Sequence, residues 1–308
     1  NLSGADAQLI MQGGVLSRLS TESTNLGVNV DNHSTISHLS LDHLTAVQIA
    51  SGASLSGSVT VNSGGTLQLT DNGTLASDLT MAGGTLDVDE SLAISGTLTL
   101  SGDFTVDVAA GKTLTSPDNL SIGSHTLTLQ GDGTLAFADN VSAVVLDEAD
   151  SLLKLEGSGK LGRVRIAASP NAGKGLQITG QPTLGSLVIS ADATIALDDQ
   201  LNVEEAVSVE GAALTLSGTG TLDTEVRLSG TLIAEGQPTL SRNLVLEDNA
   251  TLSIPNASDT LNYGGDNLTV GPHTLTLAGA GTFANAAGSP IILDLPESVL
   301  HLSGTGEV

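Results

Sequence analysis

The 308-residue sequence contains no cysteine and no tryptophan, and it has one tyrosine and three phenylalanines. The absence of cysteine excludes disulfide frameworks, thiolate zinc sites and cysteine nucleophiles. The scarcity of aromatic residues argues against the wide cores of ordinary globular domains, which rely on large rings. Hydrophobic residues still make up 39% of the chain, and almost all of them are Leu, Val, Ile and Ala. We therefore expect a narrow core of stacked aliphatic side chains.

Basic residues are also few. Nine Lys and Arg stand against 34 Asp and Glu, which gives a formal net charge of −25. Nucleic acids and anionic membranes require cationic neutralisation, so neither is expected as a partner. No apolar run approaches the ~18–20 residues of a membrane span, and no signal peptide is visible. The chain begins and ends in the middle of its own pattern, so we expect it to be a piece of a longer protein.

The chain contains two similar copies of one pattern. Residues 123–137 (GSHTLTLQGDGTLAF) and 271–285 (GPHTLTLAGAGTFAN) are identical at ten of fifteen positions and lie 148 residues apart. Self-similarity on this scale is typical of repeat arrays. We divide the chain into a first superrepeat, residues 1–160, and a second, residues 161–308, continuous with the first in one solenoid.

A shorter repeat of about twenty residues runs inside each copy. It is marked by Thr66, Thr85, Thr105 and Thr126, which are spaced 19, 20 and 21 residues apart. Between them lie short alternating runs flanked by Gly, Asn and Asp, the pattern of strands joined by tight turns. This predicts a parallel β-helix (β-solenoid), whose coils stack at the ~4.8 Å strand spacing. Tandem β-sandwich domains are the alternative, which the near absence of aromatic residues disfavours.

One segment, residues 138–157, has the composition of a helix. Its copy contains Pro290 and Pro296, which would break the interior of a helix. If the two copies share a fold, neither segment is a long helix. The fold class is therefore predicted to be all-β.

Several runs carry a resemblance to a known group of proteins. SGGTLQL, AGGTLDV and SGTLTLSGDFTV resemble the passenger regions of bacterial autotransporters and of filamentous-haemagglutinin-like exoproteins. The resemblance covers most of the chain. It implies a right-handed parallel β-helix with coils of ~19–20 residues, displayed or released at a Gram-negative cell surface and used for adhesion. No functional residue of these families matches a position here, so none is carried over.

The repeated stretch offers His125 and Asp132 as an acid–base pair. The second copy keeps the histidine as His273 but replaces the aspartate by Ala280. A catalytic pair without its carboxylate would be inactive in that copy, whereas the turn and core residues are the same in both. We therefore predict a structural role for this stretch, and no catalytic or cofactor-binding residue in the chain.

Clustered histidines and aspartates are the residues of this chain that could ligate a metal ion. One group lies near the start of the chain: Asp31, His33, His38, Asp42 and His43. The three histidines are spaced by five, which places neighbours on opposite faces of a strand, so no metal site is predicted.

Glycine-rich stretches were considered as ligand loops. The stretch YGGDNLTVG at 263–271 approaches a calcium-binding nonapeptide but lacks its third glycine, so only weak calcium binding by scattered turn aspartates stays open. The tetrapeptides GAGT, GSGK and GTGT do not continue as a phosphate-binding loop, so we expect turns.

Five basic residues gather at the junction between the copies: Lys154, Lys160, Arg163, Arg165 and Lys174. β-Solenoids also host polysaccharide lyases and hydrolases, which need converging carboxylates and often a cation for an acidic sugar. In the second copy Lys154 and Lys160 become His301 and Glu307. The sequence around the cluster also shows no set of two or three carboxylates that would converge on a substrate. We expect a solvated face, with contact to an acidic polysaccharide as the functional alternative.

These observations together predict a non-enzymatic structural segment. It would be the stalk or fibre of a secreted bacterial adhesin or biofilm-matrix protein, located outside the cell or at the bacterial surface, which mediates cell–cell or cell–surface attachment. Its expected partners are extracellular polysaccharide or other cell-surface molecules, and self-association is left open. The alternative is a polysaccharide-binding or polysaccharide-processing β-helix.

Overall fold

The computed structural model describes residues 54–69, 73–75, 78–285 and 289–307, and before residue 54 it describes the strands alone. Side chains are described from residue 59 onward, except at 69, 73 and 74. Strands and turns make up this part of the chain, with no helix in it, and therefore none that could span a membrane. The strands pair in parallel with strands about twenty residues away, which confirms the predicted β-solenoid over the tandem sandwich.

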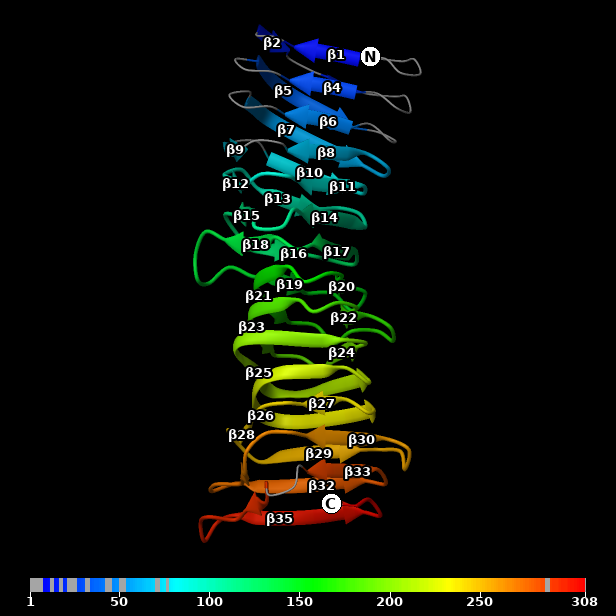
Figure 1. The fold of residues 1–308 in the computed structure, drawn as a ribbon, viewed down its shortest axis with the longest axis vertical. Coiled ribbons are helices and arrows are strands. Elements are labelled where there is room, and N and C mark those ends of the chain that lie inside the picture. Colours follow the sequence, from blue (N-terminus) through cyan, green and yellow to red (C-terminus); the bar gives the residue numbers. More distant parts are fainter. Residues whose placement is uncertain are drawn as a thin grey trace. The chain divides into compact units, whose positions relative to one another are not determined.

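The chain divides into two compact units. The first comprises residues 1–145 and 157–163, and the second comprises residues 146–156 and 164–308. Each unit is a stack of parallel coils (Figure 1). The segment with helix-like composition contains β19 (Val144–Leu146) and β20 (Leu152–Leu155), so the prediction that it is not a helix is confirmed.

One parallel ladder runs through the first unit. Its strands are β1 (Gln8–Met11), β4 (Gly27–Val30), β6 (Ala46–Ile49), β8 (Thr66–Leu69), β11 (Thr85–Val88), β14 (Phe104–Val108) and β17 (Thr126–Gly131). Thr66 pairs with Thr85, and Thr85 pairs with Thr105, as the twenty-residue repeat predicts. The next residue in this column is Thr128 and not Thr126, because that coil is longer.

Two further faces complete the coils of the first unit. One is formed by β2 (Gly14–Leu16), β3 (Leu19–Ser20), β5 (Ser34–Leu41), β7 (Ser54–Asn62), β10 (Asp78–Ala82) and β13 (Leu98–Leu100). The other contains β9 (Gly73–Leu75), β12 (Leu92–Ile94), β15 (Thr113–Ser116), β18 (Thr134–Phe137) and the start of β21 (Lys160–Ile166). β16 (Leu120–Ser121) pairs with β19.

The main ladder of the second unit is formed by β20, β22 (Gly175–Ile178), β24 (Ala193–Leu197), β25 (Gln200–Gly218), β26 (Thr221–Gly236), β29 (Ala250–Ile254), β32 (Thr274–Gly279) and β35 (Val299–Gly304). Its other faces use β23 (Thr183–Ile189), β27 (Thr239–Leu240), β28 (Leu244–Leu246), β30 (Thr260–Tyr263), β31 (Leu268–Thr269), β33 (Thr282–Asn285) and β34 (Ile291–Ile292). β25 and β26 each turn a corner without interrupting the strand.

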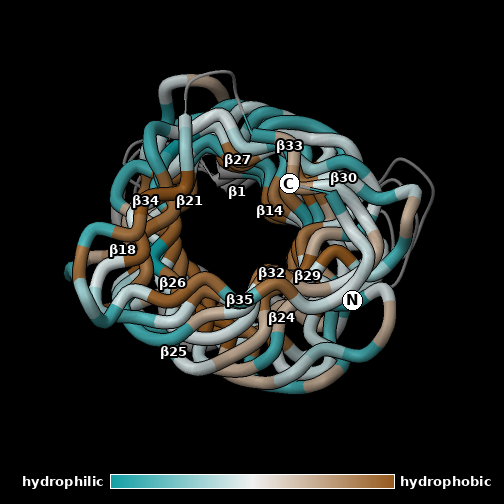
Figure 2. Tube along the Cα trace, turned by 90° about the horizontal axis from the view of Figure 1, so that it is seen from below, coloured by the Kyte–Doolittle hydropathy of each residue, from teal (hydrophilic) through white to brown (hydrophobic). Residues whose placement is uncertain are grey.

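Aliphatic side chains at alternate positions point into the coils. In β14, Phe104, Val106 and Val108 are buried, while the residues between them are half-buried. Figure 2 shows the apolar positions on the inner side of the coil and the polar positions on the outer side. Burial of one such side chain contributes about 1.5–3 kcal/mol, so stacking supplies the stability that a single coil lacks. In β17, Leu127 is buried, whereas Leu129 is half-buried.

Glycine allows the turns of successive coils to stack closely. Gly279 and Gly304 have φ values of 105° and 127°, which L-residues with a side chain rarely adopt. A Cβ atom on Gly304 would overlap the carbonyl oxygen of Gly279, and one on Gly279 would overlap that of Ile254. Gly279 opens the tetrapeptide GAGT, which resembles a phosphate loop, and the structure shows it as a turn stacked on the preceding coil.

Candidate functional site

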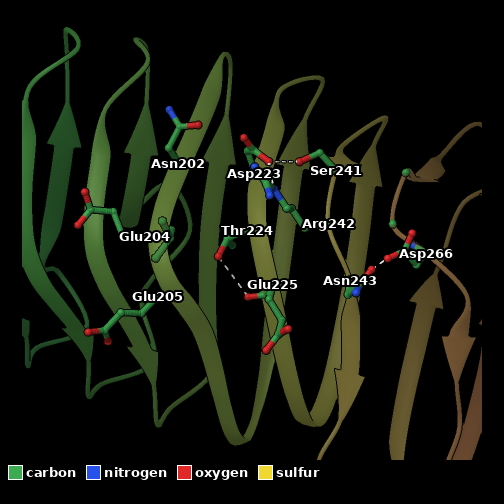
Figure 3. Close-up of a pocket in the computed structure, with 13 residues that line it drawn as sticks. Asn202, Glu204, Glu205, Asp223, Thr224, Glu225, Ser241, Arg242, Asn243 and Asp266 are labelled. Atoms are coloured by element: carbon green, nitrogen blue, oxygen red, sulfur yellow. Dashed lines mark hydrogen bonds and ion pairs between the residues drawn. The ribbon is translucent and has the colours of Figure 1, made fainter.

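A polar groove of about 590 Å³ lies on the second unit (Figure 3). Four consecutive coils form it at corresponding corners. The lining residues come from the bend of β25 (202–205), the bend of β26 (223–225), the loop between β27 and β28 (241–243) and the loop between β30 and β31 (264–266). The groove therefore runs across the coils, and no single stretch of sequence contains it.

The corner in β25 arises from a local shift in pairing. Asn202 pairs with Asp223, and the next pair joins Ala206 to Glu225, so three residues of β25 stand opposite one residue of β26. Extra residues of this kind bend a strand. Two of them, Glu204 and Glu205, are exposed carboxylates, which favour the outer side of a bend over a flat, stacked sheet.

Asp223 is the best-connected side chain of the groove. Its Oδ1 accepts hydrogen bonds from Arg242 Nε at 2.8 Å and from Ser241 Oγ at 2.5 Å. These bonds lower the pKa of Asp223, and the carboxylate in turn raises the pKa of Arg242. Arg242 is the only cation among the described residues that line the groove. Its ion pair with Asp223 balances its charge (Figure 3).

The other charged residues that line the groove are all acidic. Glu225 Oε1 lies 2.9 Å from Nε of Arg227, whose Nη1 lies 3.8 Å from Glu247. At the far end, the backbone N–H of Asp266 donates to Asn243 Oδ1 at 2.8 Å. The groove thus presents carboxylates and amide oxygens, which accept hydrogen bonds and attract cations.

Buried groups fix the base of the groove. Tyr263 is 2% exposed and accepts a hydrogen bond at its hydroxyl from the N–H of Leu244 at 3.3 Å. Its ring stacks on Phe283 with the centroids 5.8 Å apart. Burial raises the pKa of Tyr263, so the phenol stays protonated at neutral pH. A Cβ atom on Gly265 would stand 2.6 Å from this hydroxyl, which explains the glycine there.

The groove offers hydrogen-bond acceptors and negative charge to polar or cationic groups. Within the described ranges, no three or more His, Asp or Glu side chains are grouped so that they could hold a metal ion. Weak calcium binding stays a prediction. Four residues of the early cluster, Asp31, His33, Asp42 and His43, lie outside the described residues, and His38 lies in β5 with its side chain outside them.

The five predicted basic residues fall in both units. Lys160 and Arg163 belong to the first unit, and Lys154, Arg165 and Lys174 belong to the second. Lys160 and Arg165 are exposed, and the other three are half-buried. Hydrogen bonds from the N–H groups of Ser142 and Val141 lower the pKa of Asp139, and the nearby charge of Arg163 adds to this. A single polysaccharide contact formed by all five stays a prediction.

The repeated stretch has equivalent surroundings in both copies. A Cβ atom on Gly123 would stand 3.8 Å from the His125 ring, and one on Gly271 would stand 3.7 Å from His273. Both histidines therefore lie over a turn glycine. Asp132 Oδ1 accepts hydrogen bonds from Ser158 Oγ at 2.6 Å and from the Ser158 N–H at 3.1 Å, which lower its pKa. These contacts tie one coil to the next.

Sequence inspection missed the groove because its residues are about twenty positions apart. Alignment of the coils by their twenty-residue repeat would have placed NVEE, DTE, SRN and GGD at one corner. Comparisons with protein-family models, curated proteins and solved structures find no match to this chain. Its function is therefore inferred from its own residues.

Proposed function

We propose that this chain is a structural stalk segment of a secreted bacterial adhesin or biofilm-matrix protein, which acts in cell–cell or cell–surface attachment and not in catalysis. The observation that carries the proposal is which contacts the two copies share. They share a hydrogen bond that joins coils at Asp103 and Asn249, whereas charged groups that chemistry would require vary, as Asp132 does against Ala280. A spacer needs contacts between its coils, whereas a catalytic site would keep its charged groups the same in both copies.

A pair of coil-to-coil contacts illustrates this point. In the first copy Asp103 Oδ1 accepts a hydrogen bond from the N–H of Thr126 at 2.8 Å. In the second copy Asn249 Oδ1 accepts the bond from the N–H of Thr274 at 2.7 Å. The charge is lost and the hydrogen bond is retained, which suits a structural role for the side chain.

A display experiment tests the stalk proposal. The chain is fused between a bacterial surface anchor and a binding tip of known target, either once or twice in tandem. Both fusions should attach only to the target of the tip, and electron microscopy should show a wider gap between cell and target for the tandem fusion. Attachment by a fusion without the tip would overturn the proposal, since the adhesive contact would then lie on the chain itself.

The corner groove favours a second candidate function, polysaccharide binding or processing. Its carboxylates and amides could accept hydrogen bonds from sugar hydroxyls. Incubation with neutral and acidic polysaccharides, with and without calcium, would then give retention or soluble products that Glu205→Gln diminishes. Glu210→Gln is the matched control, because Glu210 is an exposed carboxylate outside the groove. The stalk proposal expects neither products nor retention.

A further inference from the structure

One short motif occurs at the same place in both copies. The stretches DNLSIG and DNLTVG begin at residues 118 and 266, and each contains Asn-x-Ser/Thr, at Asn119 and at Asn267. This acceptor motif is the pattern that carries N-linked sugars on the surface of secreted proteins. The hydroxyl residue differs between the copies, Ser121 against Thr269, and the exchange keeps the motif intact.

The asparagines of acceptor motifs are exposed, whereas most other asparagines are not. Five acceptor motifs lie where side chains are described, and the asparagine is exposed in all five: Asn119, Asn140, Asn249, Asn256 and Asn267. Of the six other asparagines in the same part of the chain, five are half-buried: Asn62, Asn202, Asn243, Asn262 and Asn285. An enzyme that modifies the folded surface requires this exposure.

Hydrogen bonds of the folded protein withdraw two of the five motifs. Nδ2 of Asn256, the atom to which a sugar would be attached, donates to Asp259 Oδ2 at 2.8 Å. In the motif of Asn140 the hydroxyl residue is Ser142, which is 8% exposed and whose side chain bonds to Asp139. Each of these motifs therefore has one of its two essential groups engaged inside the fold.

A third motif lies within the main ladder of the second unit. The hydroxyl residue that follows Asn249 is Thr251, which is half-buried in β29. Thr251 pairs with Thr231 on one side and with Thr276 on the other. An enzyme would have to reach a hydroxyl held between stacked strands.

The motif shared by the two copies presents both of its groups to solvent. Ser121 and Thr269 are exposed, like the asparagines two residues before them, and they lie in the two-residue strands β16 and β31. The residues between, Leu120 and Leu268, are 1% and 0% exposed. The buried leucine anchors each motif with its asparagine and its hydroxyl residue on the outer side.

We propose that Asn119 and Asn267 are N-glycosylation sites, one in each copy, modified on the folded protein by an asparagine glycosyltransferase. The donor is a sugar activated as a phosphate ester. Nδ2 forms a bond to the anomeric carbon and loses a proton to a base of the transferase, while the bond from this carbon to the phosphate oxygen breaks and the phosphate leaves with the electron pair. The inference rests on the proposal that the chain is secreted or displayed.

The contacts of Asn119 are compatible with this modification. Its Oδ1 accepts a hydrogen bond from the N–H of Ala143 in the next coil at 2.8 Å. N-glycosylation keeps the amide oxygen and alters only Nδ2, so this bond between coils is retained.

Peptide mass spectrometry of the protein, isolated from the cells that produce it, tests the inference. The peptides with Asn119 and Asn267 should carry a sugar, and the peptide with Asn256 should carry none. A sugar missing from either of the first two, or present at Asn256, would overturn the inference. The display fusions test the stalk proposal whether or not the chain carries sugar, so the two proposals can fail separately.

Variants of the hydroxyl residues establish that the motif is read, and not the exposed amide alone. Ser121→Ala should lose the sugar at Asn119, while Ser121→Thr, which introduces the residue of the second copy, should retain it. Thr269→Ala should lose the sugar at Asn267 alone. Ser258→Ala is the matched control, because it changes a motif that the fold withdraws, and it should leave both sugars in place. All three side chains are exposed, so the variants should fold as the unmodified chain does. A sugar that persists at Asn119 in Ser121→Ala would contradict the inference.

An experiment in vitro separates the effect of the fold from that of the sequence. The unmodified folded chain and two synthetic peptides, residues 116–123 and 253–260, are incubated with UDP-glucose and a purified enzyme that transfers glucose to asparagine. Both peptides should be modified, whereas the folded chain should gain glucose at Asn119 and not at Asn256. Equal modification of these two sites in the folded chain would overturn the argument that the bond to Asp259 withdraws Asn256.

Discussion

At the scale of the residue, the neighbours of a side chain come mainly from the coils before and after it. Leu127 pairs with Phe104 of the preceding coil, and both are buried. Thr128, the next residue, lies on the outer side and pairs with Thr105. Neighbouring positions therefore differ sharply in what they tolerate.

The first prediction compares two aspartate substitutions in β17. Leu127→Asp buries an unpaired carboxyl at a position with 0% exposure, and it should lower the free energy of unfolding by more than about 3 kcal/mol. Thr128→Asp on the outer side should lower it by less than about 1 kcal/mol. Urea denaturation followed by circular dichroism measures both values. Equal effects would show that the assigned register of β17 is wrong.

The second prediction concerns the pH dependence contributed by Asp223. Arg242 and Ser241 hold the pKa of Asp223 below its usual value in the folded state. The associated stability is present above the unfolded-state pKa of about 3.9 and is lost as pH falls through the lower, folded-state pKa. Asp223→Asn should therefore cost about 1 kcal/mol or less at pH 7, and this difference should shrink below pH ~4 and vanish once the pH is below the folded-state pKa of Asp223.

Asp248→Asn is the control for this experiment. It also removes one negative charge, but from an exposed carboxylate that bonds only to the adjacent N–H of Asn249. If the two variants show the same pH profile, the contact with Arg242 contributes nothing specific.

At the scale of the element, the turns limit how closely coils can stack. The strands tolerate many aliphatic residues, but a turn that lies against the backbone of the preceding coil has no space for a Cβ atom. This explains why the tetrapeptides that resemble phosphate loops recur along the chain. They are defined by packing between coils and not by a ligand.

The third prediction separates the two reasons for glycine in turns. In Gly279→Ala the alanine must adopt an unfavourable φ of 105°, and its Cβ atom overlaps the backbone of Ile254. Gly211→Ala has a φ of 71° but meets nothing within 4 Å. The second should cost about 1–2 kcal/mol of stability, and the first distinctly more, measured by thermal denaturation. Equal costs would mean that close stacking of turns contributes little.

At the scale of the whole molecule, excess negative charge opposes the compact state. The described ion pairs involve Lys112, Arg227 and Arg242, and they balance few of the 34 acidic residues. Stacked coils bring like charges together as well. Asp87 pairs with Asp107 on adjacent strands, and the pKa of Asp87 is raised by burial and by the charges of Asp89 and Asp107.

The fourth prediction follows from this charge. Raising NaCl from about 0.01 M to about 0.15 M shortens the screening length from about 30 Å to about 8 Å, and should raise the Tm by a few degrees at pH 7. The control is the same pair of measurements near pH 4.1, the isoelectric point, where the net charge is small. A Tm that falls with salt at pH 7 would show that attractive ion pairs outweigh the repulsion.

The sequence by itself determined the fold class, the length of a coil and the inward positions. The sequence shows the alternation of strand residues and the spacing of Thr66, Thr85 and Thr105 directly. These two features depend only on local chemistry and on a repeat. The same spacing put Thr126 fourth in this series, although the residue that pairs with Thr105 is Thr128. The lengths of individual turns vary, and only pairing between coils reveals where the extra residues go.

The tertiary structure alone decided the corner groove. Glu205, Asp223, Arg242 and Asp266 are far apart in sequence, and they meet because coils of unequal length bring their corners into line. Position within a stack is a property of the assembled ladder, so no local pattern of residues encodes it.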